Sequence, residues 1–148
     1  MSYQERRALV ALFGTIVVNA GYLAYMLPRQ PVGDAYSPEV FRFWGGFFLL
    51  LILVSIIIQI VLAILFSILN TIATRQWEPD ITDERDRLIT LKAWRNGFYA
   101  FTIGFLLAMI ALVLEMPPTT MFLLMMAGGL ASQIVDEFSE FWFYRRGV

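Results

Sequence analysis

The sequence predicts an all-α integral membrane protein, a four-helix bundle that forms one domain over residues 1–148. Four apolar stretches lie at about residues 8–26, 43–69, 97–114 and 119–138. Each is long enough to cross a bilayer, because a spanning helix needs roughly 20 mostly apolar residues. Composition agrees, since 59% of the 148 residues are hydrophobic and only 16% are charged, which is unusual for a soluble domain.

The first stretch predicts an uncleaved span, since it is longer than the apolar core of a secretory signal peptide. Residues 27–42 contain three prolines and a glycine and predict an irregular loop. The second stretch would measure about 40 Å as a helix, against a hydrocarbon core of about 30 Å, so we expect it to tilt or to project into the cytoplasm.

Lys and Arg residues divide unequally between the two sides of the membrane. With the N-terminus inside, nine fall on the cytoplasmic side and two on the other, and short cytoplasmic loops are typically enriched in these residues. We therefore expect both termini (N-in/C-in) and the 70–96 segment in the cytoplasm. The inner set is Arg6, Arg7, Arg75, Arg85, Arg87, Lys92, Arg95, Arg145 and Arg146, and the outer set is Arg29 and Arg42.

The 70–96 segment predicts a turn and helix cap over residues 79–82, followed by a helix from Asp83. Leu88, Leu91 and Phe98 share one face, so we expect a cytoplasmic interfacial helix that either lies along the membrane or runs straight into the third span. Its charged face is either simply solvated or a docking surface for a cytoplasmic partner. The docking candidates are Asp83, Glu84, Arg85, Arg87 and Trp94.

Two prolines between the third and fourth spans predict a tight antiparallel hairpin. Small residues recur every four positions in both spans and would let the two backbones approach closely, although the same face could serve a homodimer. The packing candidates are Ala100, Gly104, Ala108, Ala127, Gly128 and Ala131, with Ser132 one turn after Gly128.

Acidic residues end the fourth span just before a run of aromatic residues. Carboxylates at this depth are usually paired or functional, so the cluster is either a set of structural ion pairs or a cation or proton site. Polar residues within the spans are either interhelical contacts or a ligand path. The intramembrane and interfacial candidates are Asn19, Gln59, Gln133, Asp136, Glu137, Glu140 and, as an ion-pair partner, Arg95. Other possible ion-pair partners at the same level are Arg75 and the pair of Arg6 and Arg7.

The sequence contains no Cys and no His, which excludes disulfides, thiolate chemistry, imidazole-ligated haem and most zinc or copper sites. We therefore expect no cofactor, no metal and no enzymatic activity, because no nucleophile and base pair is evident. The net charge of −1 gives no reason to expect direct nucleic-acid binding.

The run from Asp83 to Ile89 has the form D-E-R-x-x-x-I directly before a span, and the chain continues to Tyr144, Arg145, Arg146 and Gly147 after its acidic and aromatic end. In these motifs and in its four-span layout the chain resembles small bacterial membrane proteins of the DUF2178 type. The resemblance implies a multi-pass protein of the bacterial cytoplasmic (inner) membrane. It also implies a sensor or sequestering partner for a small DNA-binding regulator.

Two functional hypotheses follow. The first is a non-enzymatic regulatory or accessory subunit that contacts membrane lipid and binds a cytoplasmic protein, alone or as a homo-oligomer. The alternative is a small ion-coupled transporter or channel subunit that uses the acids of the fourth span. The absence of a charged residue at the bilayer midplane speaks against the alternative, because transporter sites usually lie there.

Overall fold

The computed structural model describes residues 3–74 and 83–146, and within them the chain is helical without any strand. Helix α1 covers Tyr3–Met26, a 3-10 turn η1 covers Leu27–Arg29, α2 covers Pro38–Thr74, α3 covers Glu84–Val113 and α4 covers Pro118–Arg146. Four of these helices are long and apolar enough to cross a membrane. The described residues confirm the prediction of an all-α chain with four helices that are long and apolar enough to span a membrane, and each helix extends beyond its predicted span at one end or both.

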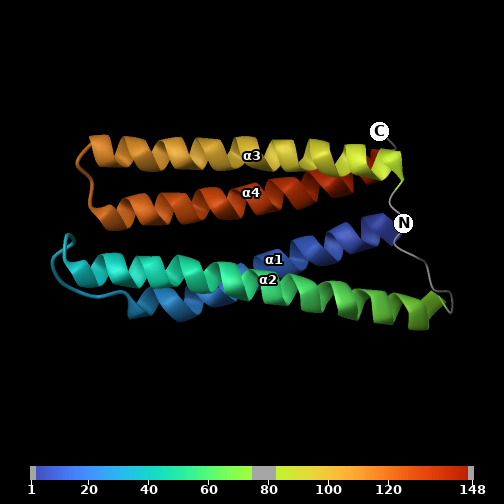
Figure 1. Ribbon diagram of the computed structural model, residues 1–148, viewed down its shortest axis with the longest axis horizontal. Coiled ribbons are helices and arrows are strands. Elements are labelled where there is room, and N and C mark those ends of the chain that lie inside the picture. Colours follow the sequence, from blue (N-terminus) through green and yellow to red (C-terminus); the bar gives the residue numbers. More distant parts are fainter. Residues whose placement is uncertain (1–2, 75–82, 147–148) are drawn as a thin grey trace.

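The helices lie side by side with alternating direction (Figure 1). The start of α1 and the end of α4 share one end of the molecule, here called the terminal end, and the opposite end is called the loop end. Helix α4 packs along α3 as an antiparallel hairpin, and α1 contacts both α4 and α2. Helix α1 crosses α2 at an angle, and α2 diverges from the other helices toward the terminal end.

Helix α2 begins at Pro38, so the last five residues of the predicted loop, 38–42, belong to the helix. Proline suits the first position of a helix, because its fixed φ is already helical and its missing N–H has no partner there anyway. With 37 residues, α2 is about 55 Å long, well beyond a hydrocarbon core of about 30 Å.

Residues 84–96 form no separate interfacial helix. They are the first turns of α3, which continues unbroken into the third span, so the second of the two predicted courses is the one observed. The Asp83 carboxylate caps the helix by accepting from the Glu84 N–H at 2.7 Å, and the Asp83 N–H donates to Asp86 Oδ2 at 3.3 Å. This capping box fixes the start of α3. The predicted turn over residues 79–82 lies outside the described residues.

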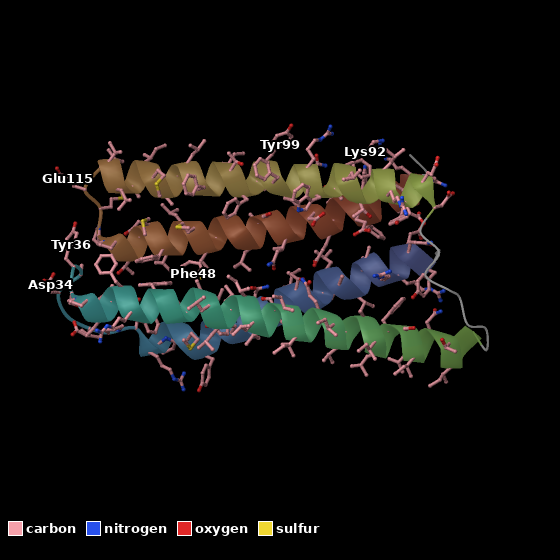
Figure 2. The ribbon with its side chains drawn as sticks, viewed as in Figure 1. Asp34, Tyr36, Phe48, Lys92, Tyr99 and Glu115 are labelled. Atoms are coloured by element: carbon pink, nitrogen blue, oxygen red, sulfur yellow. The ribbon has the colours of Figure 1, made fainter. Side chains whose placement is uncertain are left out.

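An aromatic cluster fills the loop end and joins α1, α2 and α4. Trp44 and Phe47 of α2 are buried, and the Trp44 ring stacks on Phe122 of α4 with centroids 5.4 Å apart. The Tyr22 hydroxyl of α1 donates to the backbone oxygen of Phe47 at 2.7 Å. Figure 2 shows Phe48 in the space between α2 and α4. Large rings therefore hold three helices together at this end.

The α3–α4 hairpin depends on a glycine contact. A Cβ atom added to Gly104 would lie 2.4 Å from the Gly128 Cα, a distance that real Cβ atoms do not tolerate. Ala108 is fully buried one turn further along α3. Of the other predicted packing residues, Ala100 is half-buried, and Ala127 and Ala131 are exposed. Gly128 therefore faces α3, and the alanine pair of α4 does not.

Gly128→Ala should destabilise the hairpin, because the new methyl group has no space and overpacking costs about 1–3 kcal/mol. The free energy of unfolding in detergent micelles measures the effect. Gly129→Ala is the matched control, since a Cβ at Gly129 meets no atom within 4 Å. Equal stability of the two variants would contradict the close approach of α3 and α4.

Candidate functional site: a polar cavity at the terminal end

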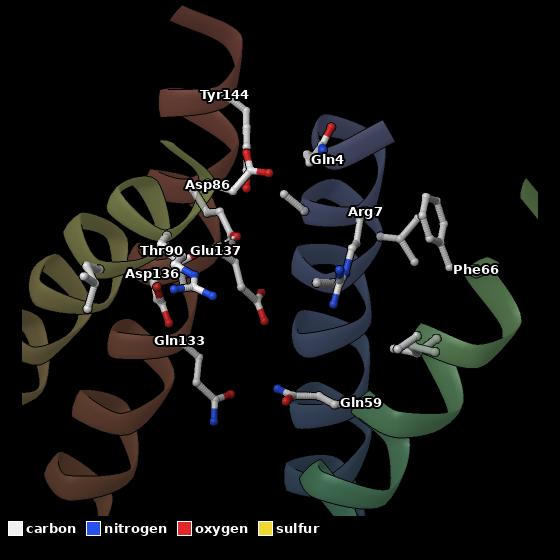
Figure 3. A pocket seen from close by; sticks show the side chains of 18 residues that line it. Gln4, Arg7, Gln59, Phe66, Asp86, Thr90, Gln133, Asp136, Glu137 and Tyr144 are labelled. Atoms are coloured by element: carbon white, nitrogen blue, oxygen red, sulfur yellow. Dashed lines mark hydrogen bonds between the residues drawn. The ribbon is translucent and has the colours of Figure 1, made fainter. Parts of the chain in front are cut away.

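A cavity of about 790 Å³ opens at the terminal end, where α2 diverges from the other helices, and all four helices line it. Figure 3 shows Gln133 and Glu137 of α4 on one side and Arg7 and Gln59, of α1 and α2, on the other. The polar lining residues are Gln4, Arg7, Gln59, Asp86, Arg87, Thr90, Gln133, Asp136, Glu137, Glu140 and Tyr144.

Glu137 links α4 to α1. The buried Thr15 hydroxyl of α1 donates to Glu137 Oε1 at 2.6 Å. The other carboxylate oxygen, Oε2, is buried and has no hydrogen-bond partner among the described residues. A buried acceptor without a partner loses the full free energy of its hydration, so Glu137 retains an unused capacity to bind a donor.

The polar contacts continue from the cavity into the span. The Asn19 amide donates to the Thr15 carbonyl at 2.8 Å and to Gln133 Oε1 at 3.3 Å, so a second side-chain contact joins α1 to α4. These residues, with Ser55 and Gln59 of α2, line a second cavity of only about 10 Å³. Beyond them, Tyr22 belongs to the aromatic surroundings of Trp44 and Phe47. The polar row therefore ends at the aromatic cluster.

The start of α3 is fastened to the end of α4 by polar contacts as well. Thr90 donates to Glu140 Oε1 at 3.3 Å, and Asn96 donates to the Ser139 hydroxyl at 3.2 Å. Asp86 lines the cavity beside Tyr144 (Figure 3), and Glu140 lines the same cavity. The two segments that the sequence analysis treated separately, the start of α3 and the acidic end of α4, therefore meet at one cavity.

Charge in the cavity is mixed. The described lining residues include four carboxylates and two guanidinium groups, those of Arg7 and Arg87. Within the described residues, no group of three His, Cys, Asp or Glu side chains is placed to hold a metal ion. The carboxylates and guanidinium groups of the lining can make charge-assisted hydrogen bonds to a ligand, and such bonds are about twice as strong as those between neutral groups.

The remaining sequence candidates lie outside the cavity. Asp83, Glu84 and Arg85 are exposed at the start of α3, and Trp94 and Arg95 are exposed further along it. Arg95 does not line the cavity that contains the acids it was expected to pair with. Arg75, another candidate ion-pair partner, lies outside the described residues.

Sequence reasoning did not single out three residues of this site, Thr15, Asp86 and Thr90. Thr15 lies one helical turn before Asn19 and shares its face of α1, which was the available signal. Threonine is common in membrane helices, however, and 122 residues separate Thr15 from Glu137 in the chain. Asp86 and Thr90 stand in a run of charged residues whose inward and outward faces the sequence does not distinguish.

No family model matches the chain, and comparison with curated proteins and with solved structures finds no match either. The functional argument therefore depends on the residues and their geometry.

Thr15→Val should destabilise the contact between α1 and α4, because the Glu137 carboxylate would then lose its donor. The expected loss is about 1–3 kcal/mol in the free energy of unfolding, measured in detergent micelles. Thr102→Val is the matched control, since the Thr102 hydroxyl donates only to the Phe98 carbonyl of its own helix. A loss of stability of the same size in both variants would contradict a specific stabilising role for the Thr15–Glu137 hydrogen bond.

Proposed function

We propose that this chain is a non-enzymatic regulatory or accessory subunit of the bacterial cytoplasmic membrane, and that the start of α3 binds a cytoplasmic protein partner. One observation carries the proposal: the first turns of α3 are held rigidly while their outer face is exposed. The capping box at Asp83 and the contacts from Thr90 and Asn96 to α4 fix the segment.

The outer face combines charge with apolar surface. Glu84, Arg85 and Leu88 are exposed, and Trp94 remains 65% exposed. Aromatic and arginine side chains are enriched where protein partners bind, and a rigid helix loses little conformational entropy on binding. The resemblance of the Asp83 to Ile89 run to proteins of the DUF2178 type is compatible with a DNA-binding regulator as the partner.

Helix length supports a cytoplasmic position for this surface. Helix α3 is about 45 Å long, some 15 Å more than the hydrocarbon core, and its charged residues lie in its first turns. The part of α3 that exceeds the hydrocarbon thickness therefore lies at the terminal end. The excess of Lys and Arg at the same end favours the cytoplasmic side for it.

A small ion-coupled transporter or channel subunit is the alternative function. The observation that favours it is Glu137 Oε2, which is buried, has no hydrogen-bond partner in the described part of the chain, and lies beside a row of polar residues that enters the span. The aromatic cluster at the loop end, beyond Asn19, argues against a continuous ion path across the membrane, because its rings fill the space between α1, α2 and α4 there. Ion flux in proteoliposomes that disappears when Asp136, Glu137 and Glu140 are neutralised would favour the alternative.

The orientation can be tested directly, because the natural chain contains no cysteine. Val32 lies in the loop between η1 and α2 with a fully exposed side chain, so Val32→Cys should react with a membrane-impermeant maleimide on intact cells. Glu84→Cys at the start of α3 should react only after the cells are permeabilised. The opposite labelling pattern would place the terminal end outside and would contradict a cytoplasmic partner.

Exchanging the charges at the start of α3, with Glu84→Lys and Arg85→Glu together, should remove the protein partner without disturbing the fold. The double variant keeps the net charge, the Asp83 cap and every lining residue of the cavity. The native protein is solubilised gently and co-purifying proteins are identified by mass spectrometry. Glu39→Arg with Arg42→Glu at the loop end is the matched control, and a partner retained equally by both double variants would contradict the docking surface.

A further inference from the structure

We propose that the cavity at the terminal end binds a phospholipid headgroup that carries both a phosphate and a primary ammonium group, the phosphoethanolamine headgroup. This inference is independent of the protein partner proposed above. It takes the cavity as a lipid site that opens toward the bilayer, and it explains the combination of acids, arginines and apolar residues in one lining.

The depth of the cavity matches the position of a headgroup. Glu137 lies 19 residues beyond the start of α4 at Pro118, and Arg7 lies 19 residues before the end of α1 at Met26. Both distances are about 28 Å along a helix, close to the hydrocarbon thickness of about 30 Å. If the loop end lies at one boundary of the hydrocarbon core, Arg7 and Glu137 lie together at the other, where lipid headgroups begin.

The charges of the lining fit a headgroup that carries both signs. Glu137 Oε2, to which no group in residues 3–74 and 83–146 donates, can accept from an ammonium N–H, with Asp136 and Glu140 nearby on the same helix. Arginine binds phosphate through paired, charge-assisted hydrogen bonds, and Arg7 and Arg87 line the same cavity. A headgroup with negative charge alone would face more carboxylates than guanidinium groups. A trimethylammonium headgroup has no N–H to donate.

The shape of the cavity also suits a lipid. Its volume of about 790 Å³ lies within the range of roughly 300–1,000 Å³ of sites for small molecules. Leu62 and Phe66 of α2 provide an apolar wall of the cavity. Val10 and Leu91 border the cavity and are 37% and 60% exposed. The acyl chains can therefore leave the cavity along apolar surface.

The test measures lipid bound to the purified, delipidated protein by native mass spectrometry. Phosphatidylethanolamine, phosphatidylcholine and phosphatidylglycerol with identical acyl chains are each titrated into the protein in detergent. We expect phosphatidylethanolamine to bind about tenfold more strongly than the other two lipids, the effect of one hydrogen bond to a charged group. Equal binding of the three lipids, or a preference for phosphatidylglycerol, would overturn the proposal.

Two variants assign the charges separately. Glu137→Gln should abolish the preference for phosphatidylethanolamine over phosphatidylcholine. Arg7→Gln should lower the affinity for both lipids and leave the ratio of the two affinities unchanged, because both lipids carry the phosphate. Glu115→Gln, an exposed carboxylate at the loop end, is the matched control and should change nothing. If Glu137→Gln does not fold, as judged by its elution volume and helical circular dichroism, Asp136→Asn replaces it. A preference that survives loss of the carboxylate overturns the assignment.

Two further probes separate a lipid from other ligands. Glycerophosphoethanolamine, the same headgroup without acyl chains, should compete only at far higher concentration, because it cannot use the apolar wall. Competition at equal concentration would make the ligand a soluble compound and overturn the lipid site. The lipophilic cation tetraphenylphosphonium should compete poorly, and strong competition that depends on Glu137 would overturn the proposal in favour of a cation site.

Discussion

The aromatic cluster at the loop end determines where the helices are close together and where they separate. Trp44 and Phe47 of α2 are almost fully buried, and the stacked ring of Phe122 and the Tyr22 hydroxyl tie them to α4 and α1. Lipid tails are as apolar as these side chains, so close packing, rather than escape from water, stabilises such a cluster. Helices α3 and α4 also touch at Gly104 and Gly128, and α2 diverges from the other helices toward the terminal end.

The terminal end is held by a few polar contacts, in place of the aromatic packing that joins the helices at the loop end. Thr15 and Asn19 connect α1 to Glu137 and Gln133, and measured contacts of this kind in membranes contribute about 0.6–2 kcal/mol each. Helix α2 makes no comparable contact with α3 within the described residues. A charge near the membrane boundary costs less than one at the centre, so the acids of α4 are compatible with the boundary position proposed for the terminal end. The helices at the terminal end are therefore joined by weak polar contacts, and the cavity lies where α2 diverges from the other three.

The sequence predicts the number and course of the helices well, because hydropathy alone determines which segments can satisfy their backbones in lipid. It could not determine rotation about the helix axis. The Ala127–Ala131 and Gly128–Ser132 pairs are neighbouring faces of α4 with the same spacing, and only packing shows that Gly128 faces α3. The acidic cluster was also evident, whereas its contacts with Thr15 and Thr90 depend on residues 122 and 50 positions away. Such pairings are set by the tertiary arrangement, which a single sequence does not contain.

The start of α3 takes part in both proposed activities through different residues. Asp86 and Thr90 face the cavity, whereas Glu84, Arg85 and Leu88 lie on the exposed side of the same turns. Arg87, expected from the sequence to belong to the docking surface, is exposed and also lines the cavity. Because one rigid helix carries both sets of residues, substitutions on one side leave the contacts of the other side in place. The two sites can therefore be separated by mutation, and each can fail without the other.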